Sequence, residues 1–362
     1  MLKNINSTKL ITVIFLIKIF GVFFSLFIFN KFSPLIDSNL YLNHYFNGVG
    51  DLRTRLIQEI VIFLSFLDDI VIHFIFSCFS VIGFLYAVIR YNLKLINLLF
   101  LLLPSSLIWT SIVGKEAIFY GFFTLLLFIW IEFLKDKLNF LDIILITLSF
   151  IICAILRPHY LVCIVWLYLS LVVVKYYYNY KNLILILSFV GLFFICYIIV
   201  YSETVLWRAL SSVEYYARAS RFVDFNILPP EIGSKLELFD DIFISFKEAL
   251  IKNWIYSIIG PRFNEIFIRI EFIPFFIEGI FILSFPIMCY LYALKMKINE
   301  FKKYKLLFFY CLIPSLMFII LVHAPFGILN PGTGIRWRVN FETIFYITPL
   351  LIFFNYNHLK IK

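Results

Sequence analysis

Charged residues are scarce in this chain, which has 362 residues of which only 15% are charged and 63% are hydrophobic. Its mean hydropathy is +0.97. Soluble domains carry about a quarter charged residues and about half apolar ones. The composition therefore excludes a soluble globular enzyme, a disordered chain and a nucleic-acid-binding domain. The net charge of +9 is therefore interpreted as that of a membrane protein rather than as a sign of nucleic-acid binding.

Several motifs of cofactor chemistry are also missing. The six cysteines all fall in apolar runs and form no metal-binding or redox spacing. Gly233 and Gly260 are isolated, so there is no glycine-rich nucleotide-binding loop. No small-residue cleavage site follows the first apolar run, so we expect that run to be a membrane span rather than a cleaved signal peptide. We expect neither a cofactor nor a metal site.

Long apolar runs are what the sequence has instead. About 20 apolar residues cross a bilayer as a helix. The runs are continuous rather than alternating, which favours helices over a β-barrel. We therefore expect an all-α, polytopic integral membrane protein with about ten transmembrane helices. Of these, 95–112 contains Pro104 and 341–354 is short, so these two could be kinked or re-entrant. The predicted spans are 10–29, 70–88, 95–112, 117–133, 141–156, 160–174, 183–201, 272–294, 306–322 and 341–354.

The spans divide the chain into three predicted parts. Residues 1–201 form an N-terminal membrane bundle of about seven helices, and residues 272–362 a C-terminal membrane part of about three. Between them, residues 202–271 form one long periplasmic loop. Within this loop, 236–254 has the pattern of an amphipathic helix that lies either on the membrane or on the protein's own spans.

The distribution of positive charge predicts the orientation. With the N-terminus inside, 15 Lys and Arg residues fall in the inner segments and 7 in the short outer loops. This bias predicts that both termini are cytoplasmic. Ten of the 11 arginines are then outside, whereas the inner cations are almost all lysines. The planar guanidinium suits phosphates and carboxylates, so the outer arginines either bind an anionic substrate or pair with the outer acids.

Three predicted outer residues could act as a catalytic base or acid. They are Asp37 in the first outer loop, Glu116 at a tight turn between two spans, and His159 at another such turn. Each also has a structural interpretation. Asp37 could cap a helix, Glu116 could be a turn charge, and His159 could be an interfacial side chain.

A second set could bind an anion. Arg336 and Arg338 stand two apart, and in an extended segment both side chains would point to one side and converge on one anion. If they are interfacial anchors instead, lysine would serve as well as arginine. The full set of expected substrate-binding residues is Lys115, Arg157, Arg218, Arg221, Arg336 and Arg338.

These features favour an anionic, lipid-linked substrate handled on the outer face. ATP is absent from that side, so the leaving group must arrive activated, as it does in a polyprenyl-pyrophosphate sugar. Arginines would stabilise the pyrophosphate as negative charge develops on it. A Glu, Asp or His would remove the proton of the attacking sugar hydroxyl.

Three motifs resemble those of Wzy-type O-antigen polymerases. They are Pro-Ser-x-x-x-Trp-x-Ser-x-x-x-Lys-Glu over 104–116, the Arg157-Pro158 turn, and Gly-Thr-x-Ile-Arg-x-Arg over 332–338. The resemblance implies a metal-independent glycosyltransferase of the bacterial inner membrane that acts in lipopolysaccharide biosynthesis. It would join undecaprenyl-pyrophosphate-linked oligosaccharide repeat units on the periplasmic face. It also implies partner proteins that flip the lipid and set the chain length.

Two alternatives remain open. A multispan glycosyltransferase that uses a polyprenyl-phosphate sugar donor would share the topology, but it usually places an acidic pair where Asp37 stands alone. A flippase for lipid-linked oligosaccharides would need polar residues deep within spans, where the sequence offers little besides Lys18 and Glu278.

Overall fold

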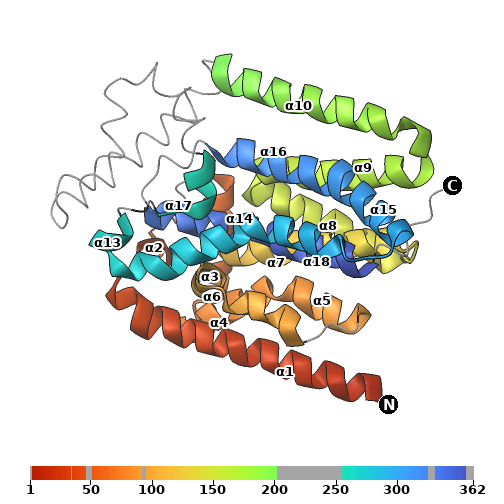
Figure 1. Ribbon diagram of the computed structural model, residues 1–362. Helices are drawn as coiled ribbons and strands as arrows, with labels where there is room; N and C mark the ends of the chain where they lie inside the picture. Colours follow the sequence, from red (N-terminus) through yellow and green to blue (C-terminus); the bar gives the residue numbers. More distant parts are fainter. Residues whose placement is uncertain are drawn as a thin grey trace. The chain divides into compact units, whose positions relative to one another are not determined.

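The computed structural model contains helices joined by turns, with no strand among the residues that it describes (Figure 1). These residues are 2–33, 35–45, 51–91, 95–201, 254–261, 263, 265–324 and 331–355. Arg218, Arg221 and nearly all of the predicted interfacial helix 236–254 lie outside them. The expectation of an all-α chain is therefore confirmed for the described residues.

Each predicted apolar run coincides with helical structure. The first helix, α1 (Leu2–Phe23), continues through a π-helical turn, Phe24–Ile28, and the run 95–112 is split into a 3-10 helix, Leu95–Leu102, and α6. The other helices are α2 (Ile36–Leu42), α3 (Leu52–Phe63), α4 (Asp69–Ser80), α5 (Ile82–Arg90), α6 (Pro104–Trp109), α7 (Lys115–Leu134), α8 (Phe140–Leu156), α9 (Leu161–Tyr176), α10 (Lys181–Tyr201), α13 (Glu265–Ile268), α14 (Ile273–Ala293), α15 (Ile298–Leu307), α16 (Ile313–His323), α17 (Pro331–Arg338) and α18 (Glu342–Asn355).

Five described helical stretches are long and apolar enough to cross a membrane. Counting α4 and α5, which meet at a bend of 47°, as one span makes six. The run 95–112 is interrupted at Pro104, and α8 and α18 are shorter than the roughly 20 residues that a span needs. A total of ten spans thus stays a prediction. The five stretches are Ser7–Lys31, Lys115–Leu134, Pro158–Tyr176, Ile270–Ala293 and Ile298–His323.

The chain forms two compact units, which are described separately. Unit 1 contains Met1–Leu161 and Val339–Ile347, and unit 2 contains Val162–Arg338 and Thr348–Lys362. The chain thus returns to unit 1 for a short segment that includes the first residues of α18. The three predicted parts depend on the loop 202–271, which lies mostly outside the described residues, so that division stays a prediction.

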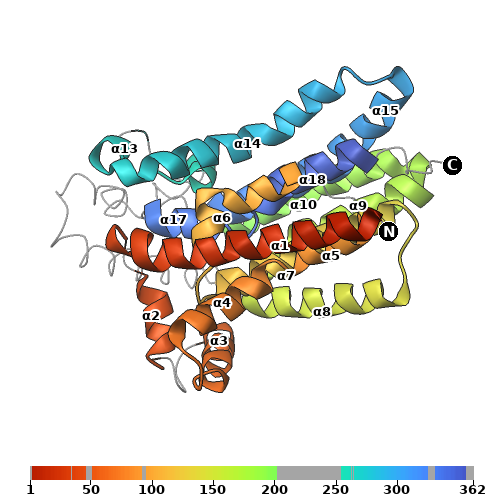
Figure 2. The same cartoon turned by 90° about the horizontal axis from the view of Figure 1, so that it is seen from below.

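Helix α7 is the centre of unit 1. It packs against α4, α5 and α8, and 94% of its most apolar stretch is buried (Figures 1 and 2). Two glycines permit this packing. A Cβ on Gly121 of α7 would lie 2.0 Å from the carbonyl oxygen of Phe79, and one on Gly83 of α5 would lie 2.7 Å from the backbone nitrogen of Leu125. Backbones therefore approach closely at small residues, as they do between helices in membranes.

In unit 2, α15 and α16 together form one of the long apolar stretches, Ile298–His323. A π-helical segment, Phe308–Leu312, joins them, and α16 packs against α10. At that contact a Cβ on Gly191 would lie 3.2 Å from the ring of Phe318, and the rings of Trp166 and Phe318 are 5.4 Å apart. Aromatic side chains therefore fill the space between these helices.

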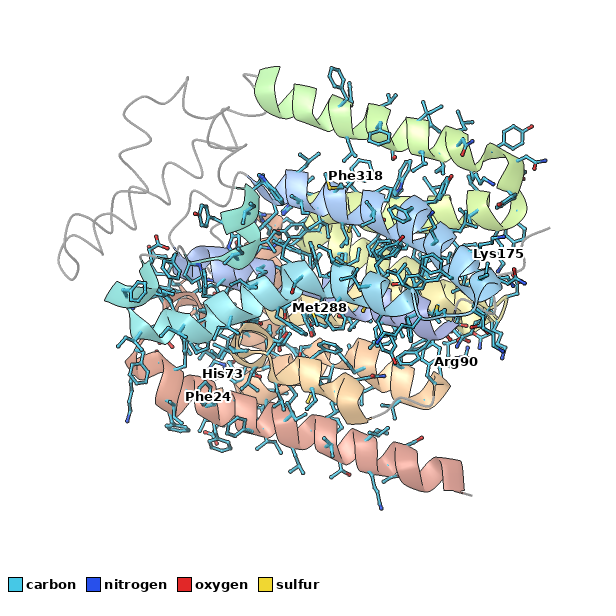
Figure 3. The ribbon with its side chains drawn as sticks, in the orientation of Figure 1. Phe24, His73, Arg90, Lys175, Met288 and Phe318 are labelled. Carbon is cyan, nitrogen blue, oxygen red and sulfur yellow. The ribbon has the colours of Figure 1, made fainter. Side chains whose placement is uncertain are left out.

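Large apolar side chains cover the outer faces of several helices (Figure 3). On α1, Leu16 is 59% exposed and Phe20 is 53% exposed, and on α10 Phe189 and Phe193 are 69% and 74% exposed. Soluble proteins rarely expose contiguous apolar surface of this kind. Together with the long apolar helices, these surfaces indicate a membrane protein.

We expect Gly121→Ala to destabilise unit 1, because the new methyl group would collide with backbone atoms of α4 rather than with a flexible side chain. Overpacking of this kind costs about 1–3 kcal/mol. Thermal unfolding of the detergent-purified protein would measure the loss. Gly334→Ala is the matched control, since a Cβ there meets nothing within 4 Å. Equal unfolding temperatures for the two variants would contradict this packing.

Candidate functional site

A buried ion pair joins two of the turns in which the sequence places functional residues. Arg157 ends α8, and its Nη2 donates to Oε1 of Glu116, in the first turn of α7, at 2.8 Å. The two side chains are only 4% and 2% exposed. Residues 41 positions apart in the sequence therefore meet in unit 1 as a guanidinium–carboxylate pair.

Lys115 extends this cluster toward α3. Its ammonium donates to the hydroxyl of Thr54 at 2.7 Å and lies 3.9 Å from the carboxylate of Asp51. Burial opposes ionisation of Asp51, but the hydrogen bonds that it accepts from Thr54 and Arg53 outweigh burial and lower its pKa to about 2. Asp51 is thus ionised at neutral pH, where it caps α3 and balances the charge of Lys115.

His159 lies in the same turn as Arg157. Its ring centroid is 4.1 Å from that of Tyr160, and Tyr160 packs in turn against Phe119 of α7 and Phe341. The imidazole is half-buried and within electrostatic range of the Arg157 guanidinium. The structure therefore brings together four of the predicted residues, Lys115, Glu116, Arg157 and His159.

Asp37 is placed differently from these four. It lies exposed in the first turn of the short helix α2, which packs against α3. The N-cap residue of α2 is Leu35, so Asp37 does not cap this helix, although an acid in the first turn suits the positive end of the helix dipole. A role as catalytic base stays a prediction.

The segment that carries Arg336 and Arg338 is helical, so the prediction of an extended segment is wrong. It forms α17, in which residues two apart are rotated by about 200° and point to different sides. Arg336 is half-buried, whereas Arg338 is fully buried. The two guanidinium groups therefore do not point to one side of an extended segment, as the sequence suggested. That either of them binds a substrate stays a prediction.

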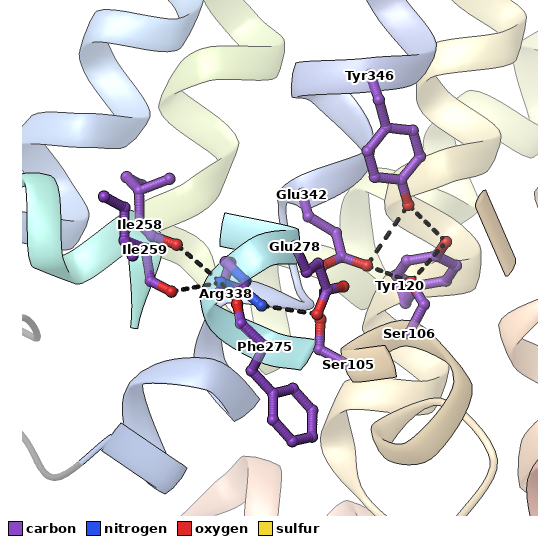
Figure 4. Close-up of polar contacts among 10 residues, drawn as sticks. All are labelled: Ser105, Ser106, Tyr120, Ile258, Ile259, Phe275, Glu278, Arg338, Glu342 and Tyr346. Carbon is purple, nitrogen blue, oxygen red and sulfur yellow. Dashed lines mark hydrogen bonds and ion pairs between the residues drawn. The ribbon is translucent and has the colours of Figure 1, made fainter. Parts of the chain in front are cut away.

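Arg338 is instead the centre of a contact network in unit 2 (Figure 4). Its Nη2 donates to Glu278 of α14 at 2.8 Å, and the two side chains are 0% and 1% exposed. Its Nη1 donates to the carbonyl oxygens of Ile258 and Ile259 at 3.0 and 2.8 Å, and to that of Phe275 at 3.3 Å. One guanidinium thus ties the end of helix 254–259 to α14 and α17.

Glycine makes room for this network. A Cβ on Gly279 would lie 2.3 Å from the carbonyl oxygen of Ile259 and 2.6 Å from Nη1 of Arg338. Gly260, which follows helix 254–259, has a φ of +89°, a region that favours glycine. The sequence signal for the network was Glu278, an acid within an apolar run.

A second carboxylate in an apolar interior, that of Glu342, lies among hydroxyl groups of unit 1 (Figure 4). Ser105 donates to its Oε2 at 3.0 Å, Ser106 donates to its Oε1, and Tyr346 donates to Oε1 at 3.5 Å. The hydroxyls of Tyr120 and Tyr346 are 3.0 Å apart. Ser105 belongs to the motif over 104–116, but the sequence predicts no role for Glu342, because the proximity of these residues is a tertiary contact.

An Arg–Asp pair joins the end of α5 to the start of α8. Arg90 at the end of α5 donates to Asp142 at 2.8 Å, and Tyr86 donates to the same carboxylate at 2.9 Å. Asp142 also completes a capping box with Asn139 at the start of α8. Arg90, the one arginine predicted inside, therefore has a structural role.

The described residues contain no group of three or more His, Cys, Asp or Glu side chains that could hold a metal ion. Cys153, Cys163 and Cys311 are buried free thiols, and Cys78 and Cys289 are partly buried free thiols. These five cysteines pack as small apolar residues, as the sequence indicates.

Comparison with known proteins yields no match among family models, curated proteins or solved structures. The site is therefore interpreted from its own residues and contacts.

We expect Arg338→Met to destabilise unit 2 strongly, because it leaves the buried carboxylate of Glu278 and three carbonyl oxygens without this donor. Removing one partner of a buried ion pair costs about 3–5 kcal/mol. The double variant Arg338→Met/Glu278→Met should recover part of that loss. Arg336→Met is the matched control on the same helix. It should change the free energy of unfolding by less than about 1 kcal/mol. An Arg338→Met protein as stable as Arg336→Met would refute the structural role.

Proposed function

We propose that this chain is a Wzy-type polymerase, a glycosyltransferase that joins undecaprenyl-pyrophosphate-linked oligosaccharide repeat units in O-antigen or related surface-polysaccharide synthesis. The substrate would be anionic and lipid-linked, and the reaction would take place on the periplasmic face. The protein would lie in the bacterial inner membrane with about ten spans and both termini cytoplasmic, as the charge bias predicts.

One observation carries this proposal: residues of the motifs that resemble the family meet in space. Glu116, from the motif 104–116, pairs with Arg157 of the Arg-Pro turn at 2.8 Å. Ser105 of that first motif and its neighbour Ser106 donate to Glu342, which lies four residues beyond the third motif. Two of the three motifs thus meet at the pair of Glu116 and Arg157, which supports a common chemical purpose more strongly than their spacing alone.

The pair of Arg157 and Glu116 suits the proposed transfer. A pyrophosphate that approaches Arg157 would compete with Glu116 for the guanidinium, since phosphate oxygens accept hydrogen bonds from it as carboxylate oxygens do. Glu116, once displaced, could accept the proton of the attacking sugar hydroxyl, with His159 as the alternative base. A new C–O glycosidic bond would form while the C–O bond to the pyrophosphate breaks, and undecaprenyl pyrophosphate would leave with both electrons of that bond.

A transport function is the second candidate, because the interior of unit 1 is more polar than the sequence indicates. Lys18, Thr110, Ser106 and Glu342 are all fully buried there. Polar and charged groups deep among spans mark transport pathways in many membrane proteins. A flippase for lipid-linked oligosaccharides would therefore account for these residues without any transfer chemistry.

Deleting the gene should separate the two functions. Loss of a polymerase should leave single repeat units capped onto the outer acceptor, with no ladder of longer chains on a polysaccharide gel. Loss of a flippase should strand the lipid-linked units on the cytoplasmic leaflet and leave the acceptor bare. An unchanged ladder would exclude both functions, and the wild-type gene supplied on a plasmid controls for effects on neighbouring genes.

Arg336 is the arginine of the third motif that remains half-buried rather than buried, so it is the better substrate ligand of the two. We expect Arg336→Lys to keep the charge but lose the bidentate grip, and so to lower the polymerisation rate by about 10- to 1000-fold. Chain-length distributions at equal protein abundance would measure this. Arg90→Lys is the control: Arg90 forms a structural pair with Asp142 in unit 1, so this variant should leave the distribution unchanged. Wild-type chains from Arg336→Lys would refute the role.

A further inference from the structure

Lys18 is a fully buried cation in the middle of the first apolar helix. Its ammonium donates to the hydroxyl of Thr110, and that hydroxyl donates to the carbonyl oxygen of Ser106. One turn further along α1, a Cβ on Gly21 would lie 2.9 Å from the carbonyl oxygen of Leu107 and 2.3 Å from the hydroxyl of Ser111. Gly21 therefore lets α1 approach the segment 107–111 closely enough for Lys18 to reach Thr110.

Glu342 lies at the other end of the same segment. Ser105 and Ser106 of α6 donate to its two carboxylate oxygens, and Glu342 is within electrostatic range of Lys18. Residues 105–110 thus place hydroxyl groups next to a buried acid and a buried base. A charge in an apolar interior is costly unless it is paired and hydrogen-bonded. This segment supplies hydrogen-bonding hydroxyls to both charges, and each charge lies within electrostatic range of the other.

The chemistry of this pair differs from that of the Arg–Glu pairs. Arginine stays protonated at any physiological pH, so the guanidinium beside Glu116 or Glu278 favours a permanently ionised carboxylate. Lysine can release its proton, and buried lysines and glutamates have been found to titrate between about pH 5 and pH 9. The hydroxyls of Ser106, Tyr120 and Tyr346 can each donate or accept, so they can reorient when the charge of Glu342 changes.

We propose that Lys18 and Glu342 form a proton-binding site in the interior of unit 1, which takes up and releases one proton while the fold is maintained. In the ionised pair, Lys18 is an ammonium and Glu342 a carboxylate. Uptake of one proton from water converts the carboxylate to a carboxylic acid and leaves the ammonium unchanged. One of the hydroxyls that donate to the carboxylate would then turn to accept from the single O–H of the acid, while the others would go on donating to its carbonyl oxygen. This site would operate whichever lipid-linked substrate the protein handles.

Other titratable groups face the site. Cys78 of α4 is within electrostatic range of Lys18. Tyr120 of α7 and Tyr346 of α18 are linked to each other and to Glu342 through their hydroxyls. These groups are neutral until they lose a proton, so at their ordinary pKa values none of them carries a charge near neutral pH.

Labelling with dicyclohexylcarbodiimide tests the proposal, since this reagent modifies protonated carboxyl groups in apolar surroundings. We expect peptide mass spectrometry of the detergent-purified protein to show modification of Glu342 that decreases at least tenfold between about pH 5 and pH 9. Glu116 and Glu278 are internal controls in the same sample and should stay unmodified. Lys18→Met removes the neighbouring charge and should move the midpoint up by about one pH unit or more, whereas Lys18→Arg should not.

A second measurement needs no reagent and can be made on the wild-type protein, so it does not depend on access of the reagent or on the folding of a variant. In infrared difference spectra of the wild-type protein, the carboxylic acid band of Glu342 should appear on acidification and be missing in Glu342→Gln. Tyr346→Phe keeps the ring but removes one hydroxyl donor, and should also move the midpoint upward. A Glu342 that shows no pH-dependent protonation by either method would overturn the proposal, as would identical midpoints for Lys18→Met and Lys18→Arg.

Discussion

The cost of placing a charged side chain in an apolar interior is the constraint on which this structure depends. Buried charges persist only where a partner and hydrogen bonds compensate for lost water. Among the described residues, Glu116 pairs with Arg157, Glu278 pairs with Arg338, and Glu342 lies among hydroxyls near Lys18. Each contact joins segments far apart in the sequence. Within each unit, a buried charge therefore finds its partner only when the helices pack together.

Close backbone approach at glycine makes this compensation possible. Gly121 brings α7 against α4, Gly279 brings α14 against the end of helix 254–259, and Gly21 brings α1 against the segment 107–111. In the last two cases a charged side chain, Arg338 or Lys18, reaches its partners beside the glycine. Larger residues there would hold the helices apart and lengthen the hydrogen bonds that stabilise the charges.

The sequence predicts the helices of this chain well but its contacts only in part. Apolar runs are a local property, and each predicted run coincides with helical structure. Lys115, Glu116, Arg157 and His159 were each predicted as candidate site residues because each stands at a turn next to an apolar run, but their meeting in one cluster was not predicted. The role of Glu342 was missed, and Arg336 and Arg338 were expected in an extended segment, because a Pro-Gly-Thr-Gly sequence is typical of a turn. Here Pro331 begins a helix instead.

Some of the arginines in the predicted outer segments now have a structural explanation. Arg53, Arg157, Arg269 and Arg338 each form an ion pair with an acid, and so does Arg90, the one arginine predicted inside. A planar guanidinium binds a carboxylate and backbone carbonyls at once, as Arg338 does, which an ammonium matches poorly. Arginine was therefore selected at these positions at least in part for burial and pairing. The proposal of an anionic substrate then rests less on the number of arginines than on Arg157, whose pairing with Glu116 a phosphate could exchange, and on the half-buried Arg336.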